Sequence, residues 1–138
     1  MFQLYTPQTA NHVLPKVKSL FASIVSGNKH IVLLHNELQQ LVEDGVSFEK
    51  FVSKKQEVNA AVTNLHKSVQ QLEDMGVLIK SIEEGLLDFP SKRFDREVWL
   101  CWKQGESEVK FWHGKEEGFM GRKPLGTDGF LEDLEKLR

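Results

Sequence analysis

The stretch VKSLFASIVSGNKHIVLLHNELQQL, residues 17–41, decides the fold class. Its apolar side chains recur every seven residues on two helix positions, with Val17, Ile24, Ile31 and Leu38 on one and Leu20, Leu34 and Leu41 on the other. This spacing places an apolar stripe along one side of an α-helix, where it packs against a second helix. The spacing continues unchanged across Gly27, so we predict one long helix that is weakened there by about 1 kcal/mol relative to alanine.

Signals at the helix ends extend this helix and predict a second one. Thr6 is a good N-cap for the first helix. The break at Asp44-Gly45-Val46 is followed by Ser47, which can cap a second helix that ends at Met75-Gly76. The second helix carries its own stripe, with Phe48, Val62 and Val69 on one position and Phe51, Val58, Leu65 and Leu72 on the other. Because a short loop joins the helices, residues 1–75 are predicted to form a long antiparallel helical hairpin.

After the second helix the pattern changes to short β-rich runs separated by turn residues. Residues 77–82 and 86–89 flank a three-residue turn at 83–85 and predict a β-hairpin. Pairing across that turn places Lys80 opposite Asp88, a favourable cross-strand pair.

A second hairpin is predicted further along the chain. Pro90 is expected to end the first hairpin, and residues 91–96 to form a basic loop. Residues 97–103 and 107–113 then flank a two-residue turn at Gly105-Glu106. That turn sets a register with Trp102 opposite Val109, Leu100 opposite Phe111, Val98 opposite His113, and Trp99 opposite Trp112.

The predicted fold class is therefore α+β: a long antiparallel helical hairpin followed by a small antiparallel sheet of two β-hairpins. We expect a single domain over residues 1–138, because most domains hold roughly 100–150 residues. Its parts are the helical hairpin at 1–75, the strands at 76–113, and a loop at 114–138 that ends in a short helix over Phe130 to Leu137.

Composition excludes several classes of function. The chain has 18 Lys+Arg against 20 Asp+Glu, and this balance disfavours nucleic-acid binding. Its one cysteine, Cys101, can form neither an intramolecular disulfide nor a Cys-rich zinc site. No apolar run approaches the roughly 20 residues of a membrane span, and the N-terminus lacks a signal-peptide layout, so we expect a cytoplasmic protein without membrane contact.

Chemically capable side chains gather in residues 85–124, on short strands and the loops between them. The candidate ligand-binding residues are Asp88, Cys101, Trp102, Glu106, Trp112, His113 and Arg122. Each has a structural alternative: His113 as a hydrogen-bonded structural histidine, and Cys101 as a small buried hydrophobe. Since no His and Asx partner for Cys101 is identifiable, no catalytic residue is assigned.

Metal and anion binding are weighed in the same segment. Asp88, Glu106 and His113 could converge on a metal, but no H-x-x-x-H or H-E-x-x-H spacing supports a site, so no metal ligand is assigned and no cofactor is indicated. The glycine-bearing segment 118–124 could approach an anion, with Arg122 binding phosphate or carboxylate bidentately. The alternative is a tight turn in which Arg122 forms a salt bridge.

Four segments carry a resemblance to a known family: Y-T-P-Q-T-A-N-H-V-L-P (5–15), G-L-L-D-F-P (85–90), V-W-L-C-W-K-Q-G-E (98–106) and F-W-H-G-K-E-E-G-F-M-G-R-K-P (111–124). In this order the chain resembles domain of unknown function 2203, a family of small bacterial and archaeal proteins. The family has no established activity, so the resemblance implies signature positions within 88–124 and no reaction or cofactor.

Two functions stay open. The first is a homodimeric interaction or scaffold module: Leu14, Val25, Val32 and Leu33 lie off the apolar seam, which predicts that two hairpins pair as a four-helix bundle. The second is a site for a small molecule, anion or metal, enzymatic or not, with Asp88 or Glu106 as acid or base, His113 as proton carrier and Arg122 as anion clamp. Nucleic-acid binding would rest on Lys92, Arg93, Arg96 and Lys123 with the tryptophan pair.

Overall fold

The computed structural model describes residues 3–126 and divides the chain into two compact units. Among the described residues, the helical unit consists of 20–71, and the sheet unit consists of 3–19 and 72–126. The first turns of the first helix thus belong with the sheet. The short helix expected at 130–137 lies outside the described residues.

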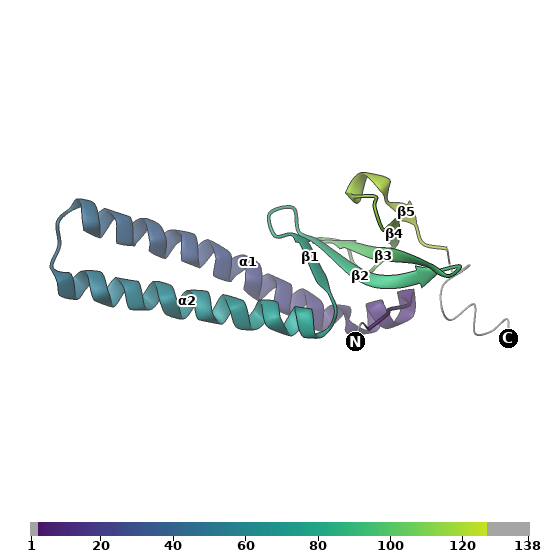
Figure 1. Ribbon diagram of the computed structural model, residues 1–138, viewed down its shortest axis with the longest axis horizontal. Coiled ribbons are helices and arrows are strands. Elements are labelled where there is room, and N and C mark those ends of the chain that lie inside the picture. The colour runs from purple at the N-terminus through teal and green to yellow at the C-terminus, as the bar shows by residue number, and fades with distance from the viewer. Residues whose placement is uncertain (1–2, 127–138) are drawn as a thin grey trace. The chain divides into compact units, whose positions relative to one another are not determined.

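Two long helices confirm the predicted hairpin. Helix α1 spans Pro7–Glu43 and helix α2 spans Phe48–Asp74, and in the helical unit they run side by side (Figure 1). The helix α1 continues through Gly27, as the unbroken heptad spacing predicts. Thr6 and Thr9 cap its start reciprocally, because the Thr9 N–H donates to Thr6 Oγ1 at 3.1 Å and the Thr6 N–H donates to Thr9 Oγ1 at 2.8 Å.

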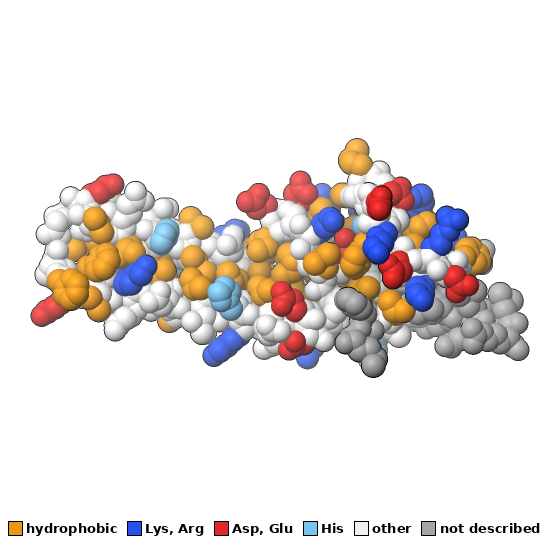
Figure 2. All heavy atoms as spheres, viewed as in Figure 1, with side chains coloured by type: hydrophobic (Ala, Val, Ile, Leu, Met, Phe, Trp, Pro, Cys, Tyr) orange, Lys and Arg blue, Asp and Glu red, His pale blue; other side chains and the backbone are white. Residues whose placement is uncertain are grey.

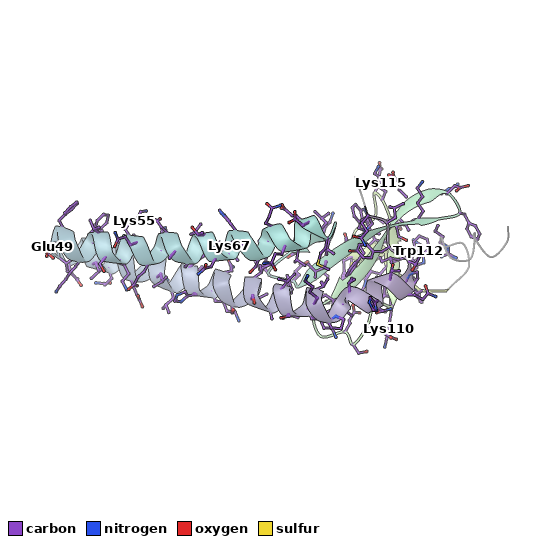
Figure 3. All side chains as sticks on the ribbon, turned by 90° about the horizontal axis from the view of Figure 1, so that it is seen from below. Glu49, Lys55, Lys67, Lys110, Trp112 and Lys115 are labelled. Carbon is purple, nitrogen blue, oxygen red and sulfur yellow. The ribbon has the colours of Figure 1, made fainter. Side chains whose placement is uncertain are left out.

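The core of the helical unit is small. Its buried apolar side chains are Phe21, Ile24, Leu34, Leu38 and Val58. Leu20, Ile31 and Leu41, which also belong to the predicted seam, are only half-buried. Charged side chains such as Glu49 and Lys55 lie on the outside of α2 (Figure 3).

The sheet unit holds one antiparallel sheet in the order β1-β2-β3-β4-β5 (Figure 1). Its strands are β1 Leu78–Ser81, β2 Leu86–Arg93, β3 Arg96–Lys103, β4 Phe111–Gly114 and β5 Lys123–Pro124. A short 3-10 helix, η1 Phe119–Gly121, precedes β5. Strand β5 lies where the sequence predicts a loop, since a two-residue strand has no periodicity to detect.

The prediction that Pro90 ends a strand is wrong, because β2 continues through Pro90 to Arg93. Proline supplies no N–H, but β1 pairs with β2 only as far as Asp88, so no neighbouring strand needs that donor. The N-terminal segment pairs there instead: the Tyr5 N–H donates to the Pro90 carbonyl at 2.7 Å, and Ser91 Oγ donates to the Tyr5 carbonyl.

Both predicted registers are wrong. Leu78, and not Lys80, lies opposite Asp88, because the register shifts between Ile79 and Ser81. Between β3 and β4 the register differs by one residue from the prediction, which moves every β4 side chain to the other face. The observed pairs are Val98 with Gly114, Trp99 with His113, Leu100 with Trp112, and Cys101 with Phe111.

The cause of this slip is the β3–β4 connection, which spans residues 104–110 and is longer than a two-residue turn. Asn11 from α1 holds it through both backbone groups of Val109. The Val109 N–H donates to Asn11 Oδ1 at 2.6 Å, and Asn11 Nδ2 donates to the Val109 carbonyl at 3.3 Å. Trp99 and Trp112 consequently lie on opposite faces of the sheet and do not form the predicted pair.

The core of the sheet unit joins the sheet to the first turns of α1. Tyr5 meets Phe89 edge to face, with ring centroids 5.2 Å apart. Leu14, expected off the seam, is only 3% exposed because it lies in the part of α1 that belongs to this unit. The buried apolar side chains include Leu72, Val77, Leu87, Leu100, Trp102 and Val109.

Candidate functional site

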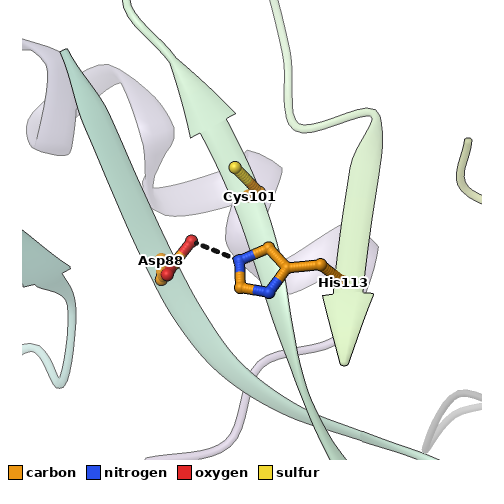
Figure 4. A group of neighbouring side chains, drawn as sticks. All are labelled: Asp88, Cys101 and His113. Atoms are coloured by element: carbon orange, nitrogen blue, oxygen red, sulfur yellow. Dashed lines mark hydrogen bonds and ion pairs between the residues drawn. The ribbon is translucent and has the colours of Figure 1, made fainter. Parts of the chain in front are cut away.

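Three of the candidate residues meet in the centre of the sheet. Asp88 on β2, Cys101 on β3 and His113 on β4 occupy adjacent strands (Figure 4). Asp88 pairs with Cys101 in the β2–β3 register, which places both side chains on the same face. One donor atom from each of the three side chains lies within 4.8 Å of the other two, and the three residues are 0–2% exposed.

The hydrogen bonds of His113 fix the number of protons in this cluster. His113 Nδ1 lies 2.9 Å from the Gly114 carbonyl, which can only accept, so Nδ1 carries a proton. His113 Nε2 lies 3.1 Å from Asp88 Oδ1. One further proton must lie between these two atoms, on either the imidazole or the carboxyl group, because two acceptors cannot form a hydrogen bond. Asp88 and His113 therefore form a buried hydrogen-bonded pair that shares one proton between Oδ1 and Nε2.

Cys101 is a poor nucleophile in this setting. Burial first, and then the nearby Asp88 charge, raise the pKa of its thiol to about 11 against the smaller opposing effect of Arg122. The thiol is thus protonated at neutral pH, whereas a catalytic cysteine needs a lowered pKa. In addition, both His113 ring nitrogens already have acceptor partners, so the cluster does not form a Cys-His-Asp relay.

Glu106 and Arg122 form a separate network beside this cluster. Arg122 Nη2 donates to Glu106 Oε1 at 2.6 Å and to the Cys101 carbonyl at 3.4 Å. The Lys103 N–H donates to the same Glu106 oxygen at 2.6 Å, and Trp102 Nε1 donates to the Glu106 carbonyl at 2.9 Å. These contacts favour the salt-bridge alternative for Arg122, in which it fastens the β3–β4 connection.

The guanidinium group of Arg122 is also covered by aromatic rings. It lies 4.0 Å from the ring centroid of Phe111 and 4.6 Å from that of Phe119 in η1. With its charge engaged by Glu106 and its faces occupied, Arg122 offers little to an incoming anion.

Sequence reasoning missed a cavity of about 780 Å³ at the end of the sheet where β2 turns into β3. The β2–β3 turn and strands β3 to β5 contribute Arg93, Phe94, Arg96, Val98, Trp112 and Lys123 to its lining. Arg93 lies 4.7 Å and Lys123 lies 4.8 Å from the Trp112 ring centroid. The basic run at 91–96 was the available signal, and it was considered only for nucleic-acid binding.

The turn at this cavity is strained. Phe94 and Asp95 adopt φ values of +48° and +64°, in the left-handed region that suits glycine or asparagine. Phe94 remains 57% exposed despite its aromatic ring. Non-glycine residues held in this region are often found at functional sites.

Two acidic residues of the cavity are already paired with lysines. Glu97 binds Lys115 at 2.7 Å and Glu117 binds Lys123 at 2.8 Å. The hydrogen bond to the partner lysine is the main cause that lowers the pKa of each carboxyl group. Besides these ion pairs, the lining carries the two arginines Arg93 and Arg96.

Fold and site together define a small α+β protein with a helical hairpin, an antiparallel sheet and a buried Asp–His–Cys cluster. Residues 3–125 match the sequence model of the family described as uncharacterized conserved protein DUF2203, and the chain belongs to that family. This match confirms the resemblance to domain of unknown function 2203. No curated protein and no solved structure matches the chain significantly. Within residues 3–126, neither helix combines the length and apolar character that a membrane span requires.

Proposed function

We propose that the chain is a homodimeric interaction module, in which the helical unit packs against that of a second copy as a four-helix bundle. The observation that carries this proposal is the incomplete burial of the apolar seam. The seam residues that remain half-buried on the two helices are Leu20, Ile31, Leu41, Phe51, Val62, Leu65 and Val69. A second pair of helices covers such a seam in four-helix bundles.

Exposed apolar side chains in the same unit support a protein partner. Val32 and Leu33 on α1 are 54% and 55% exposed, and near the hairpin turn Val42 and Phe48 are 58% and 77% exposed. Figure 2 shows hydrophobic side chains gathered along the helical hairpin on the viewed face. Apolar surface of this kind is typical of association sites.

Charge favours a second copy as the partner. Residues 20–71 contain five lysines and five acidic residues, so their net charge is zero. Two helical units therefore do not repel each other through net charge. The lysines are Lys29, Lys50, Lys54, Lys55 and Lys67, and the acidic residues are Glu37, Glu43, Asp44, Glu49 and Glu57. A symmetric dimer is also the commonest oligomer of soluble proteins.

The experiment is sedimentation of the chain and of the double variant Val32→Glu with Leu33→Glu. Both side chains are already more than half exposed, so the variant should fold, and helical circular dichroism checks this. We expect the dimer dissociation constant to rise at least about 100-fold, which corresponds to about 2.7 kcal/mol. Met120→Glu, at a position 99% exposed in the sheet unit, is the matched control and should leave the dimer intact.

A second candidate function is binding of a small aromatic anion, such as a nucleotide, in the cavity beside Trp112. It is favoured by one specific observation: two arginines, a tryptophan and a strained turn line a single cavity of about 780 Å³. A guanidinium group binds phosphate bidentately. The Trp112 ring, with Arg93 and Lys123 already 4.7 Å and 4.8 Å from its centroid, is an aromatic surface of the cavity.

Adenosine monophosphate and inorganic pyrophosphate are the probes for this second function. A ligand at 100 times its dissociation constant adds about 2.7 kcal/mol of stability, so a thermal shift detects it. We expect Arg96→Gln to weaken binding at least about tenfold by removing one charged hydrogen-bond donor. Lys110→Gln, an exposed position outside the cavity, is the control, and no shift with either probe would contradict this candidate.

A further inference from the structure

We propose that Asp88, Cys101 and His113 bind one divalent transition-metal ion, with Zn²⁺ the best match to the donor set. A carboxylate oxygen, a thiolate sulfur and an imidazole nitrogen are the three donors that zinc takes in proteins. Bond lengths of about 2.0–2.3 Å to a tetrahedral ion put its donors about 3.3–3.7 Å apart. The three donor atoms here lie within 4.8 Å of one another, so a contraction of about 1 Å would complete three of four positions.

The orientation of His113 suits a metal ligand. The bond from Nδ1–H to the Gly114 carbonyl fixes the tautomer and turns Nε2 toward Asp88. Histidine ligands almost always donate their other ring N–H to a carbonyl or carboxylate in this way, because the bond holds the ring and raises the basicity of the ligating nitrogen.

A buried polar atom without a partner provides an independent observation. Asp88 is 0% exposed, and its Oδ2 has no hydrogen-bond partner among the described residues. Leaving a buried carboxylate oxygen unsatisfied is costly, and coordination to a cation is a common remedy. Arg122 contacts the cluster at the Cys101 main-chain carbonyl, to which its Nη2 donates at 3.4 Å.

The charges balance when the ion is bound. Binding displaces the Cys101 thiol proton and the proton shared by Asp88 and His113, and both leave to solvent. The resulting thiolate and carboxylate carry two negative charges against the two positive charges of the ion, with a neutral imidazole. With the ion bound, the buried cluster has zero net charge and the Asp88 carboxylate is coordinated. Without the ion, Asp88 Oδ2 is unsatisfied within residues 3–126.

Burial assigns the ion a structural role. The three residues come from adjacent strands, so one ion cross-links β2, β3 and β4. Because the residues are 0–2% exposed, the ion enters as the sheet folds or opens. The sequence offers no spacing signal for this site, since its ligands are contributed by three separate strands.

The test uses the whole chain, unfolded in chelator and refolded with or without Zn²⁺ or Co²⁺. We expect one Zn²⁺ per chain after removal of excess ion, a rise in Tm, and a thiolate-to-metal charge-transfer absorption in the Co²⁺ form. Cys101→Ala keeps a small apolar side chain in place and should fold, but it should lower Zn²⁺ affinity at least about 100-fold and abolish that absorption. His35→Gln, at an exposed position in the helical unit, is the control and should change neither result.

Two outcomes would overturn the proposal. One is a wild-type chain whose Tm and absorption respond to neither ion after refolding at micromolar protein. The other is a Cys101→Ala variant that folds and still binds Zn²⁺ as tightly as the wild type. That result would assign the ion to histidines elsewhere in the chain.

Discussion

At the scale of single residues, Asp88 and His113 depend on each other. Each is at most 2% exposed, and the 3.1 Å hydrogen bond between them satisfies Asp88 Oδ1 and His113 Nε2 together. Removing either side chain leaves the other without its partner in a place that water does not reach. Such a loss costs more than the net contribution of the intact pair.

A double-mutant cycle measures this dependence. With chelator present, we expect Asp88→Ala and His113→Ala each to lower the free energy of unfolding by about 3–5 kcal/mol. The double variant should lose less than the sum of the two, by at least about 1 kcal/mol, because neither side chain is then left unpaired. Urea unfolding gives all three values, and strictly additive losses would contradict a coupled pair.

The sequence predicted which residues are chemically capable, but not which of them meet. Asp88, Cys101 and His113 share a face only because the β3–β4 register is offset by one residue from that of a two-residue turn. The Asn11 side chain, which holds Val109, stands 98 positions earlier in the chain. A tertiary contact over that separation leaves no local pattern to detect.

At the scale of elements, the sequence predicted the helices more accurately than it predicted the strands and their registers. A heptad repeat specifies one face over many turns, so the single glycine at position 27 did not break the prediction. Short strands carry only two or three residues per face, and bulges or longer loops move their register. The shift between Ile79 and Ser81, and the extension of β2 through Pro90, are of this kind.

Gly27 provides a test of the helical unit. A Cβ atom added there would lie 3.5 Å from Leu65 Cδ1, which is ordinary van der Waals contact. We therefore expect Gly27→Ala to raise the free energy of unfolding by about 0.5–1 kcal/mol, because alanine loses less conformational entropy in a helix.

Gly45 supplies the matched comparison. A Cβ atom added there would meet nothing within 4 Å, but the φ of +67° at Gly45 lies in the left-handed region. Gly45→Ala should thus lower the free energy of unfolding by about 1–2 kcal/mol. Thermal or urea unfolding distinguishes the two variants, and a stabilising Gly45→Ala or a destabilising Gly27→Ala would contradict the described helix and turn.

At the scale of the whole molecule, the two compact units differ in how well they bury their apolar residues. The sheet unit closes over a core that includes Tyr5, Phe89, Leu100 and Trp102. The helical unit buries five apolar side chains and leaves Val32, Leu33, Val42 and Phe48 exposed. From this contrast we infer that the helical unit carries the association surface, whereas the cavity and the buried cluster belong to the sheet unit.

The mass of the intact wild-type chain in solution tests the central proposal most directly. Light scattering after size exclusion, at micromolar concentrations over a tenfold dilution series, should give twice the chain mass of 15.9 kDa. Dimers held by an apolar seam of this kind should persist over that range. A mass of one chain throughout the series would contradict the account of this protein as a homodimeric interaction module.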